Sequence, residues 1–409
     1  MIAGMGRTSV EQRICVEIEA RRAFLLDDLR RHVALPTGGG NTSALDETRE
    51  LLIQRLTALG ATVTIEHGES APRWLYGEQC LSPPPTAVAR KPGIGPPILL
   101  ACHLDTVHDP RGSFRDLTIS ADGATATGPG CVDMKGGIVI TLAALEALAA
   151  AGVNASWTVL LTSDEETGSF CSDHVLTREA RAAHQGGGVG LVVEPALPGG
   201  ALATERLGSG QFMIEAHGRS AHVGRDFASG VSAVTALAHA LVRVSEIPDL
   251  PRGLIANVGP IESNRATNAV PDHARAWGNV RFPSEPLSRE LGAALDAIAT
   301  APDAMPRVTV HRNFNRPAKP MTPAVERLAM LARGTAEDLG QTLPFTKTGG
   351  VCDGNILQHE GLPTIDTLGV RGGGLHTPEE WIELASLVER CQLLAVLMTR
   401  IREGAWTGE

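Results

Sequence analysis

Residues 157–168 read WTVLLTSDEETG, and this stretch decides how the rest of the sequence is interpreted. It begins as a continuous apolar run, which is typical of a short strand buried on both faces. It ends in three consecutive acids, Asp164, Glu165 and Glu166. Carboxylates this close raise one another's pKa values unless a positive charge lies between them. The stretch is therefore either a buried strand that ends in a solvated turn or one side of a cation site. The second interpretation requires ligands elsewhere in the chain.

Apolar strands of the same kind recur on both sides of this stretch. PILLACHLDTV (97–107) and GLVVE (190–194) are short apolar runs with polar ends, and helical spacing of apolar residues separates the strands, as over 138–148. Strands without polar alternation, separated by helices, indicate an α/β fold whose mixed sheet is mainly parallel and covered on both faces. Further expected elements are helices over 11–31 and 46–59, a strand over 62–66, an irregular proline-rich loop over 82–97, a helix from about 323, a strand over 362–370 and a last helix from about 380.

The order of expected elements changes in the middle of the chain. The pattern there predicts strands over 210–217, 253–259, 274–282 and 306–312 and helices over 230–244 and 287–299. That order, β-α-β-β-α-β, is the ferredoxin-like arrangement and suits a compact inserted domain. We therefore expect one discontinuous domain formed by residues 1–206 and 318–409, with residues 207–317 inserted into it.

Composition and charge argue against several classes of protein. Lys and Arg number 36 against 46 Asp and Glu, the net charge is -10, and aromatic residues make up only 3%. A nucleic-acid binder needs a basic surface and stacking rings, which such a chain lacks. The N-terminal sequence lacks the apolar core of a secretory signal, and no apolar run reaches the roughly 18 residues of a membrane span. The seven cysteines include no CxxC pair and favour free thiols in a reducing compartment. We expect a cytoplasmic protein that binds neither nucleic acid nor membrane.

Residues that suit a metal ion follow several of the expected strands or lie next to them. They are His103, Asp105, Asp133, Glu165, Glu166, Glu194 and His376. In open α/β sheets, sites form at the carboxyl ends of the strands. Two imidazoles and several carboxylates, with no thiolate, suit zinc or a similar divalent ion in a catalytic site. Each of these residues alone is commonly a cap, a turn or a satisfied core residue, but their shared position at one sheet edge predicts a metal centre.

Eight motifs carry a resemblance to a known family. They are HLDTV (103–107), GPGCVDMKGG (128–137), DEETGS (164–169), EP (194–195), GRSAHVGRDFASGVSA (218–233), TNAVPDHARAWGNVRF (267–282), TGGVCDGN (348–355) and GGGLHTPEE (372–380). Together and in this order they resemble the M20 zinc metallopeptidases, and within that family the glutamate carboxypeptidase branch. The resemblance implies a zinc-peptidase-like catalytic domain, a lid and dimerisation domain in the insertion, and a homodimer.

The resemblance also assigns metal ligands. Asp133 would bridge two zinc ions in each subunit. His103 and Glu194 would complete the ligand set of one ion. Glu166 and His376 would complete that of the other ion, and cobalt or manganese could replace zinc.

Two further residues of the centre receive roles from the resemblance. Glu165 would be the general base that takes a proton from the water between the ions and passes it to the leaving amine. Asp105 would orient His103, as a partner of a metal-bound histidine commonly does. The peptide bond between Asp133 and Met134 would be cis, as in the family.

The resemblance places substrate-binding residues mainly on the insertion. His222 would reach across a dimer interface and stabilise the tetrahedral oxyanion. Arg281 would bind the free α-carboxylate of the substrate through its guanidinium fork. Asn268 matches a family asparagine of the lid, and Gly350 would let the backbone pass close to the substrate.

The sequence departs from the family pattern at three places. Cys102 and Cys352 stand near the ligands, where we expect them to be small buried residues rather than ligands. The lysine that glutamate-specific relatives use for the substrate side chain has no match after Glu194. The alternatives are Arg206, Arg225 and Lys347.

The sequence thus predicts a two-zinc metallohydrolase, a metallo-carboxypeptidase or amidohydrolase. It would release a free C-terminal amino acid, glutamate in the branch it resembles, from a small N-acyl, N-aroyl or peptidyl substrate. One alternative is an N-acyl-amino-acid deacylase of the aminoacylase type that prefers a non-acidic side chain. The other is a non-catalytic dimeric binding protein, which would be expected to lack a ligand or the base, whereas this sequence has them all.

Overall fold

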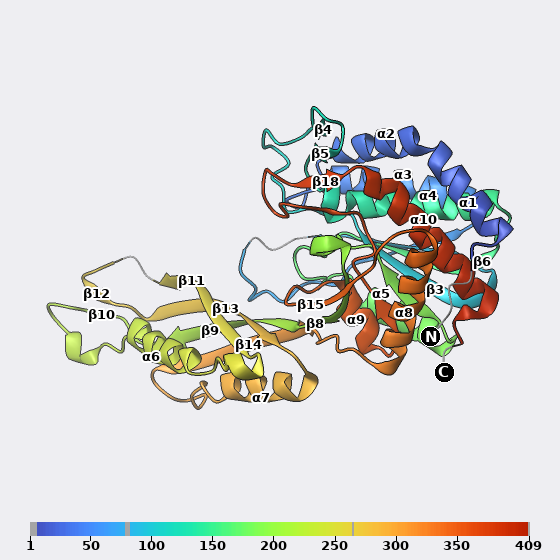
Figure 1. Cartoon of the computed structure of the whole chain (residues 1–409). Coiled ribbons are helices and arrows are strands. Elements are labelled where there is room, and N and C mark those ends of the chain that lie inside the picture. Colours follow the sequence, from blue (N-terminus) through green and yellow to red (C-terminus); the bar gives the residue numbers. More distant parts are fainter. Residues whose placement is uncertain (1–5, 78–81, 264–265, 408–409) are drawn as a thin grey trace.

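The computed structural model describes residues 6–77, 82–263 and 266–407, which form a larger unit and a smaller unit that extends from one side of it (Figure 1). The helices are α1 (Ser9–Ala20), α2 (Arg22–Val33), α3 (Thr42–Ala58), α4 (Gly136–Ala150), α5 (Asp173–Gln185), α6 (Ala233–Ser245), α7 (Glu285–Asp296), α8 (Pro323–Asp338), α9 (Asp353–His359) and α10 (Ala385–Arg400). The strands of the larger unit are β1 (Thr62–Glu66), β2 (Thr86–Lys91), β3 (Ile94–His103), β4 (Thr118–Ile119), β5 (Thr125–Thr127), β6 (Ala155–Thr162), β7 (Val189–Val192), β8 (Leu202–Arg206), β15 (Phe345–Thr348), β16 (Thr364–Ile365), β17 (Gly372–Gly373) and β18 (Trp381–Glu383). Those of the smaller unit are β9 (Gly208–His217), β10 (Ala221–His222), β11 (Ile255–Ser263), β12 (Ala269–Val270), β13 (His273–Phe282) and β14 (Arg307–Arg316).

A six-stranded mixed sheet forms the centre of the larger unit, in the order β1-β2-β6-β3-β7-β16. The four strands from β6 to β16 are parallel, and β2 runs antiparallel to both of its neighbours. One face packs with α4, α8 and α10 into the main core, and the other packs against α5 and α9. This confirms the expected α/β fold, because apolar strands of this kind need helices on both faces.

Helix α4 is apolar around most of its circumference, GGIVITLAALEALAA, because it is enclosed by the sheet, α1 and α10. A glycine near its start allows a close approach to the end of β7. A Cβ atom at Gly137 would lie 2.3 Å from the carbonyl oxygen of Val193. The start of α4, which follows Asp133, is therefore held next to the strand end that carries Glu194.

The smaller unit has an antiparallel sheet in the order β11-β13-β9-β14, with its own hydrophobic core formed with α6 and α7. The chain order β9-α6-β11-β13-α7-β14 and this strand order have the expected ferredoxin-like arrangement. A loop of the larger unit contacts the face opposite to the helices, where the indole nitrogen of Trp277 donates a 2.6 Å hydrogen bond to the carbonyl of Trp74. The chain passes between the two units after β8 and again after β14.

Four expectations about individual elements are wrong. The helix expected over 11–31 is two helices, because Arg21 leaves the helical conformation and its guanidinium pairs with Glu146 on α4. The proline-rich stretch 82–97 is not irregular throughout. It contains β2 and the start of β3. Pro96 and Pro97 lie at a shift in the register of β3, where the sheet does not need the backbone N–H groups that proline lacks.

The C-terminal part differs in a similar way. The strand expected over 362–370 is reduced to β16, since Thr367 has a φ of 62° and leaves the extended conformation. The last helix begins at Ala385 rather than near 380, because residues 381–383 form β18, which joins β17, β5 and β4 in a separate small sheet. This small sheet holds the loop that carries His376. None of the helices within the described ranges is both long and apolar enough to cross a membrane. The cytoplasmic location stays a prediction.

Candidate metal centre

The candidate ligands come from neighbouring parallel strands of the central sheet. β6, β3 and β7 lie side by side, and their carboxyl ends lead into Glu166, His103 and Glu194. Asp133 lies in the irregular turn before α4, and the peptide bond that follows it is cis, as the resemblance implied. His376 lies in the loop between β17 and β18 with a φ of 63°. The structure thus brings all five expected ligands to one edge of the sheet.

Asp133 lies between two pairs of these side chains. Its Oδ1 is 3.2 Å from Nε2 of His103, which in turn is 3.9 Å from Oε1 of Glu194. Its Oδ2 is 3.6 Å from Nε2 of His376, which is 3.3 Å from Oε2 of Glu166. One carboxylate therefore presents a different oxygen to each of two ligand pairs.

Burial disfavours the charged forms of the carboxylates in the centre. Burial raises the pKa of Glu166 to about 9 and that of Glu194 well above its ordinary value. Burial also opposes ionisation of Asp133, but the hydrogen bond from His103 and the charge of the nearby His376 hold its pKa below the usual range. Among the described residues, Oε1 of Glu166 is buried and has no hydrogen-bond partner. Buried carboxylates with unused lone pairs beside two imidazoles fit a bound divalent cation, and the donor set is of the zinc type.

The three consecutive acids after β6 point to different partners. Oδ2 of Asp164 accepts the backbone N–H groups of Cys171 at 2.6 Å and Ser172 at 3.3 Å, so this acid holds the following turn. Glu166 faces the ligand cluster, and Glu165 contacts Arg316 instead. A buried strand can end in three acids here because each has a separate partner.

Asp105 acts on the centre mainly through the backbone. Its carboxylate accepts the N–H groups of Glu165 at 3.2 Å and Glu166 at 2.9 Å, which fixes the turn that carries both acids. Nδ1 of His103 lies 3.0 Å from the carbonyl oxygen of Asp105 and 3.6 Å from its carboxylate. The hydrogen bond that orients the His103 ring thus involves the backbone oxygen of Asp105.

A buried arginine that sequence reasoning missed contacts the expected base. Nη2 of Arg316, at the end of β14, lies 2.9 Å from Oε1 of Glu165, and Nη1 lies 3.0 Å from Oδ1 of Asp353. Burial raises the pKa of Glu165 to about 7, and the charge of Arg316 opposes this rise. Nothing local in the sequence marks Arg316, because it is one charged residue at the end of a strand.

Glu380 is a second residue whose role the sequence did not reveal, although it belongs to the motif GGGLHTPEE. Its Oε1 accepts the backbone N–H groups of Val132 at 2.9 Å and Asp133 at 3.0 Å, and its Oε2 accepts that of Gly130 at 2.9 Å. The same Oε2 also contacts Nε2 of His108. Glu380 therefore fixes the turn that presents Asp133.

The residues expected to bind substrate do not all lie near this cluster. His222 is exposed on β10, Arg225 follows in the same exposed turn, and Asn268 is exposed just before β12. Figure 1 places β10 and β12 at the end of the smaller unit that is remote from the larger one. Within one chain, these three residues are separated from the metal ligands.

Arg281 and Gly350 lie closer to the groups around the centre. Arg281, on β13, is partly buried, and its Nη1 has no hydrogen-bond partner among the described residues. Burial lowers the pKa of Arg281, and the neighbouring charge of Arg316 lowers it further. The carbonyl of Gly350 accepts a 3.1 Å hydrogen bond from Nη1 of Arg206. Arg281 is thus a partly buried cation that could take an anionic group.

Two of the three alternatives for the substrate side chain already have acidic partners. Arg206 is buried and bonds to Asp366 at 2.7 Å, and Lys347 lies 2.7 Å from Glu205. Cys102 and Cys352 are buried, as expected for packing residues.

Comparisons with known proteins agree with this fold. Residues 99–400 match the peptidase family M20/M25/M40. Over 391 residues the chain is 27% identical to carboxypeptidase G2 of Pseudomonas sp. (strain RS-16), covering 93% of this chain and 90% of that protein. Over 339 residues it is 27% identical to succinyl-diaminopimelate desuccinylase of Methylobacterium radiotolerans, covering 78% and 85%.

Solved structures share the fold at low sequence identity. A tripeptidase from Staphylococcus aureus has a TM-score of 0.72 at 20% identity and covers 98% of this chain and 100% of its own. An M20 family metallo-carboxypeptidase from Sulfolobus solfataricus has a TM-score of 0.69 at 14% identity and covers 93% and 99%.

Together these findings define the class of the protein, a hydrolase that acts on peptide or amide bonds. Because the match extends over well more than half of the sequence, the chain belongs to the peptidase family M20/M25/M40. The family is metal-dependent, and the centre described above offers candidate ligands.

Proposed function

We propose that the protein is a two-metal carboxypeptidase or amidohydrolase that releases a free C-terminal amino acid from an N-acyl, N-aroyl or peptidyl substrate. The single observation that carries this proposal is the position of Asp133, whose two oxygens face different ligand pairs. His103 and Glu194 would hold one zinc ion, and Glu166 and His376 the other. Ions bound there would polarise the amide carbonyl and lower the pKa of the attacking water.

The protein's own residues would handle the proton and the substrate. Glu165 takes a proton from the attacking water while the water oxygen bonds to the carbonyl carbon. Glu165 then gives that proton to the leaving nitrogen as the C–N bond breaks. Arg316 holds the Glu165 carboxylate in position. Arg281 pairs with the α-carboxylate of the substrate, which its unpartnered Nη1 supports.

A specific observation favours a second candidate for the released amino acid. Arg206 is the buried one of the three alternatives and could bind an acidic substrate side chain only by losing Asp366, whereas Lys347 and Arg225 are exposed. This supports an N-acyl-amino-acid deacylase with a non-acidic preference over strict release of glutamate. Rates on folate, p-aminobenzoyl-glutamate and a series of N-acetyl amino acids would separate the two candidates.

The base is tested by Glu165→Gln, with Glu290→Gln as a matched control at an exposed salt bridge of the smaller unit. We expect Glu165→Gln to keep its metal content and to lower kcat about 10²- to 10⁴-fold, because it removes the acid–base group. A chelator should abolish wild-type activity, and added zinc should restore it. Near-normal turnover of Glu165→Gln, or full activity of the metal-free protein, would overturn the proposal.

We also propose that residues 1–206 and 318–409 form the catalytic domain, that residues 207–317 form a lid, and that the protein is a homodimer. His222 is remote from the centre of its own chain, so it could reach a substrate only from a partner subunit. Mixing the inactive variants His222→Ala and Glu165→Gln should then restore activity, because a mixed dimer contains one site with both groups intact. Mixtures that stay inactive although subunits exchange would exclude this arrangement.

A further inference from the structure

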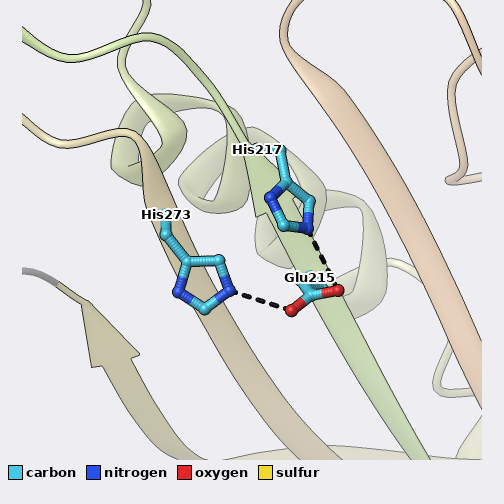
Figure 2. A group of neighbouring side chains, drawn as sticks. All are labelled: Glu215, His217 and His273. Carbon is cyan, nitrogen blue, oxygen red and sulfur yellow. Dashed lines mark hydrogen bonds and ion pairs between the residues drawn. The ribbon is translucent and has the colours of Figure 1, made fainter.

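A second group of metal-compatible side chains lies on the sheet of the smaller unit. Glu215 and His217 are two residues apart on β9, so they point to the same face. His273 on β13 is the direct cross-strand partner of His217. Their chain neighbours Ile214, Ala216 and Ala274 pack into the core with α6 and α7, so the three polar side chains lie on the face opposite to the helices. Figure 2 shows both imidazoles turned towards the Glu215 carboxylate.

The polar atoms of these three side chains converge. Nε2 of His273 lies 2.8 Å from Oε1 of Glu215, and Nε2 of His217 lies 3.1 Å from Oε2 (Figure 2). The centroids of the two rings are 5.1 Å apart. One ligand atom from each residue lies within 4.8 Å of the others. Ligands about 2.0–2.1 Å from a tetrahedral ion lie roughly 3.3 Å from one another. Small side-chain rotations would bring these atoms to that spacing.

Two arginines lie directly across from the group, Arg275 from Glu215 and Arg307 on β14 from His217, and neither makes an ion pair with the Glu215 carboxylate among the described residues. Arg275 is the direct cross-strand partner of Glu215, but its guanidinium is bonded to Glu262 at 2.8 Å and lies over the ring of Trp277. Glu215 is therefore left to the two imidazoles. All three side chains of the group are partly exposed, so an ion and a water ligand can reach them.

The scaffold under the group is suited to hold a fixed ligand set. β9 and β13 are the two central strands of the sheet and pair over ten consecutive positions without a bulge, from Gly208 with Phe282 to His217 with His273. Sites on regular strands keep their geometry better than sites on loops. Two imidazoles and one carboxylate form a common donor set for zinc and related divalent ions with an open position.

We propose that Glu215, His217 and His273 bind a divalent transition-metal ion of the zinc type, at a site separate from the metal centre at the edge of the large sheet. The ion would link β9 to β13, and water would complete its coordination. This inference does not depend on the proposed catalytic function, because it concerns different residues in the other unit. Binding would also stabilise the folded protein in proportion to the logarithm of free ion concentration.

The site is tested by counting zinc in untagged protein after dialysis against buffered zinc, by elemental analysis. The double variant His217→Ala/His273→Ala removes both imidazoles. The matched control His67→Ala/His239→Ala removes two exposed histidines that do not belong to the group. We expect the control to bind as many zinc ions as the wild type and the double variant to bind one fewer per chain. Hydrolysis rates should stay near the wild-type rate in both.

A conservative variant keeps the test decisive if the double variant folds poorly. Glu215→Gln keeps the size of the side chain and removes the charge. Since changes outside the direct ligand set already cost about 10- to 100-fold in metal affinity, loss of this ligand should weaken zinc binding at this site at least ~10-fold in a competition titration with a chromogenic chelator. Equal zinc counts in the wild type and a folded double variant, or an unchanged affinity in Glu215→Gln, would overturn the proposal.

Discussion

Replacing Arg316 by methionine removes a guanidinium that joins the smaller unit to two acids beside the metal centre. Arg316 is buried, and its two nitrogens make bonds of 2.9 Å to Glu165 and 3.0 Å to Asp353. Each charge-assisted hydrogen bond contributes about 1.5–3 kcal/mol. Breaking a buried ion pair from one side costs about 3–5 kcal/mol, because the remaining carboxylates stay buried without their counter-charge. We expect the free energy of unfolding to fall by an amount in that range.

The same strand provides the control. Arg312 on β14 also makes two bonds to one acid, at 2.7 and 2.6 Å from Asp296, but the two side chains are 36% and 53% exposed. An exposed pair contributes about 0–1 kcal/mol, so Arg312→Met should change stability little. Urea unfolding of the metal-free variants, followed by circular dichroism, measures both. Equal losses for Arg316→Met and Arg312→Met would refute the conclusion that the burial of Arg316 makes its ion pairs important.

Two further predictions test other parts of the fold. Burial lowers the pKa of His32 to about 4 from its ordinary 6.5, so the unfolded chain takes up a proton in a pH range where the folded protein does not. The free energy of unfolding should therefore fall by on the order of 3 kcal/mol as the pH drops from about 6.5 towards 4. Urea unfolding of His32→Leu at several pH values should show a free energy of unfolding that depends less on pH in this range. An unchanged pH dependence would exclude His32 as the cause. Two helical glycines should respond to alanine with opposite signs. Gly334 has open space around it, so Gly334→Ala should stabilise α8 by about 0.5–1 kcal/mol, whereas Gly137→Ala places a Cβ atom 2.3 Å from a backbone carbonyl and should destabilise by about 1–3 kcal/mol. If thermal unfolding shows that both substitutions change the stability in the same direction, the close approach of α4 to β7 is contradicted.

The local sequence pattern predicted those helices and strands whose conformation depends mainly on residues close in the chain. The apolar run before Asp164 identified β6, and the helical spacing of apolar residues over 138–148 identified α4. It failed where distant residues decide. The proline-rich stretch became strand because β6 and β1 pair with it from both sides. The strand expected over 362–370 is shorter because the chain turns at Thr367, whose hydroxyl bonds to the backbone of the distant residues Ala201 and Ala203.

The sequence by itself determined the class of fold, since hydrophobic periodicity records which faces of each element are buried. It also indicated the residue types of the candidate metal centre, because metal-ligand chemistry is a property of single side chains and these side chains occur in motifs at strand ends. Only the tertiary structure decided which oxygen of Asp133 faces which pair, that Arg316 meets Glu165, and that His217 lies across from His273. These are contacts between residues far apart in the chain, and their geometry is set by sheet register and packing, which no local pattern encodes.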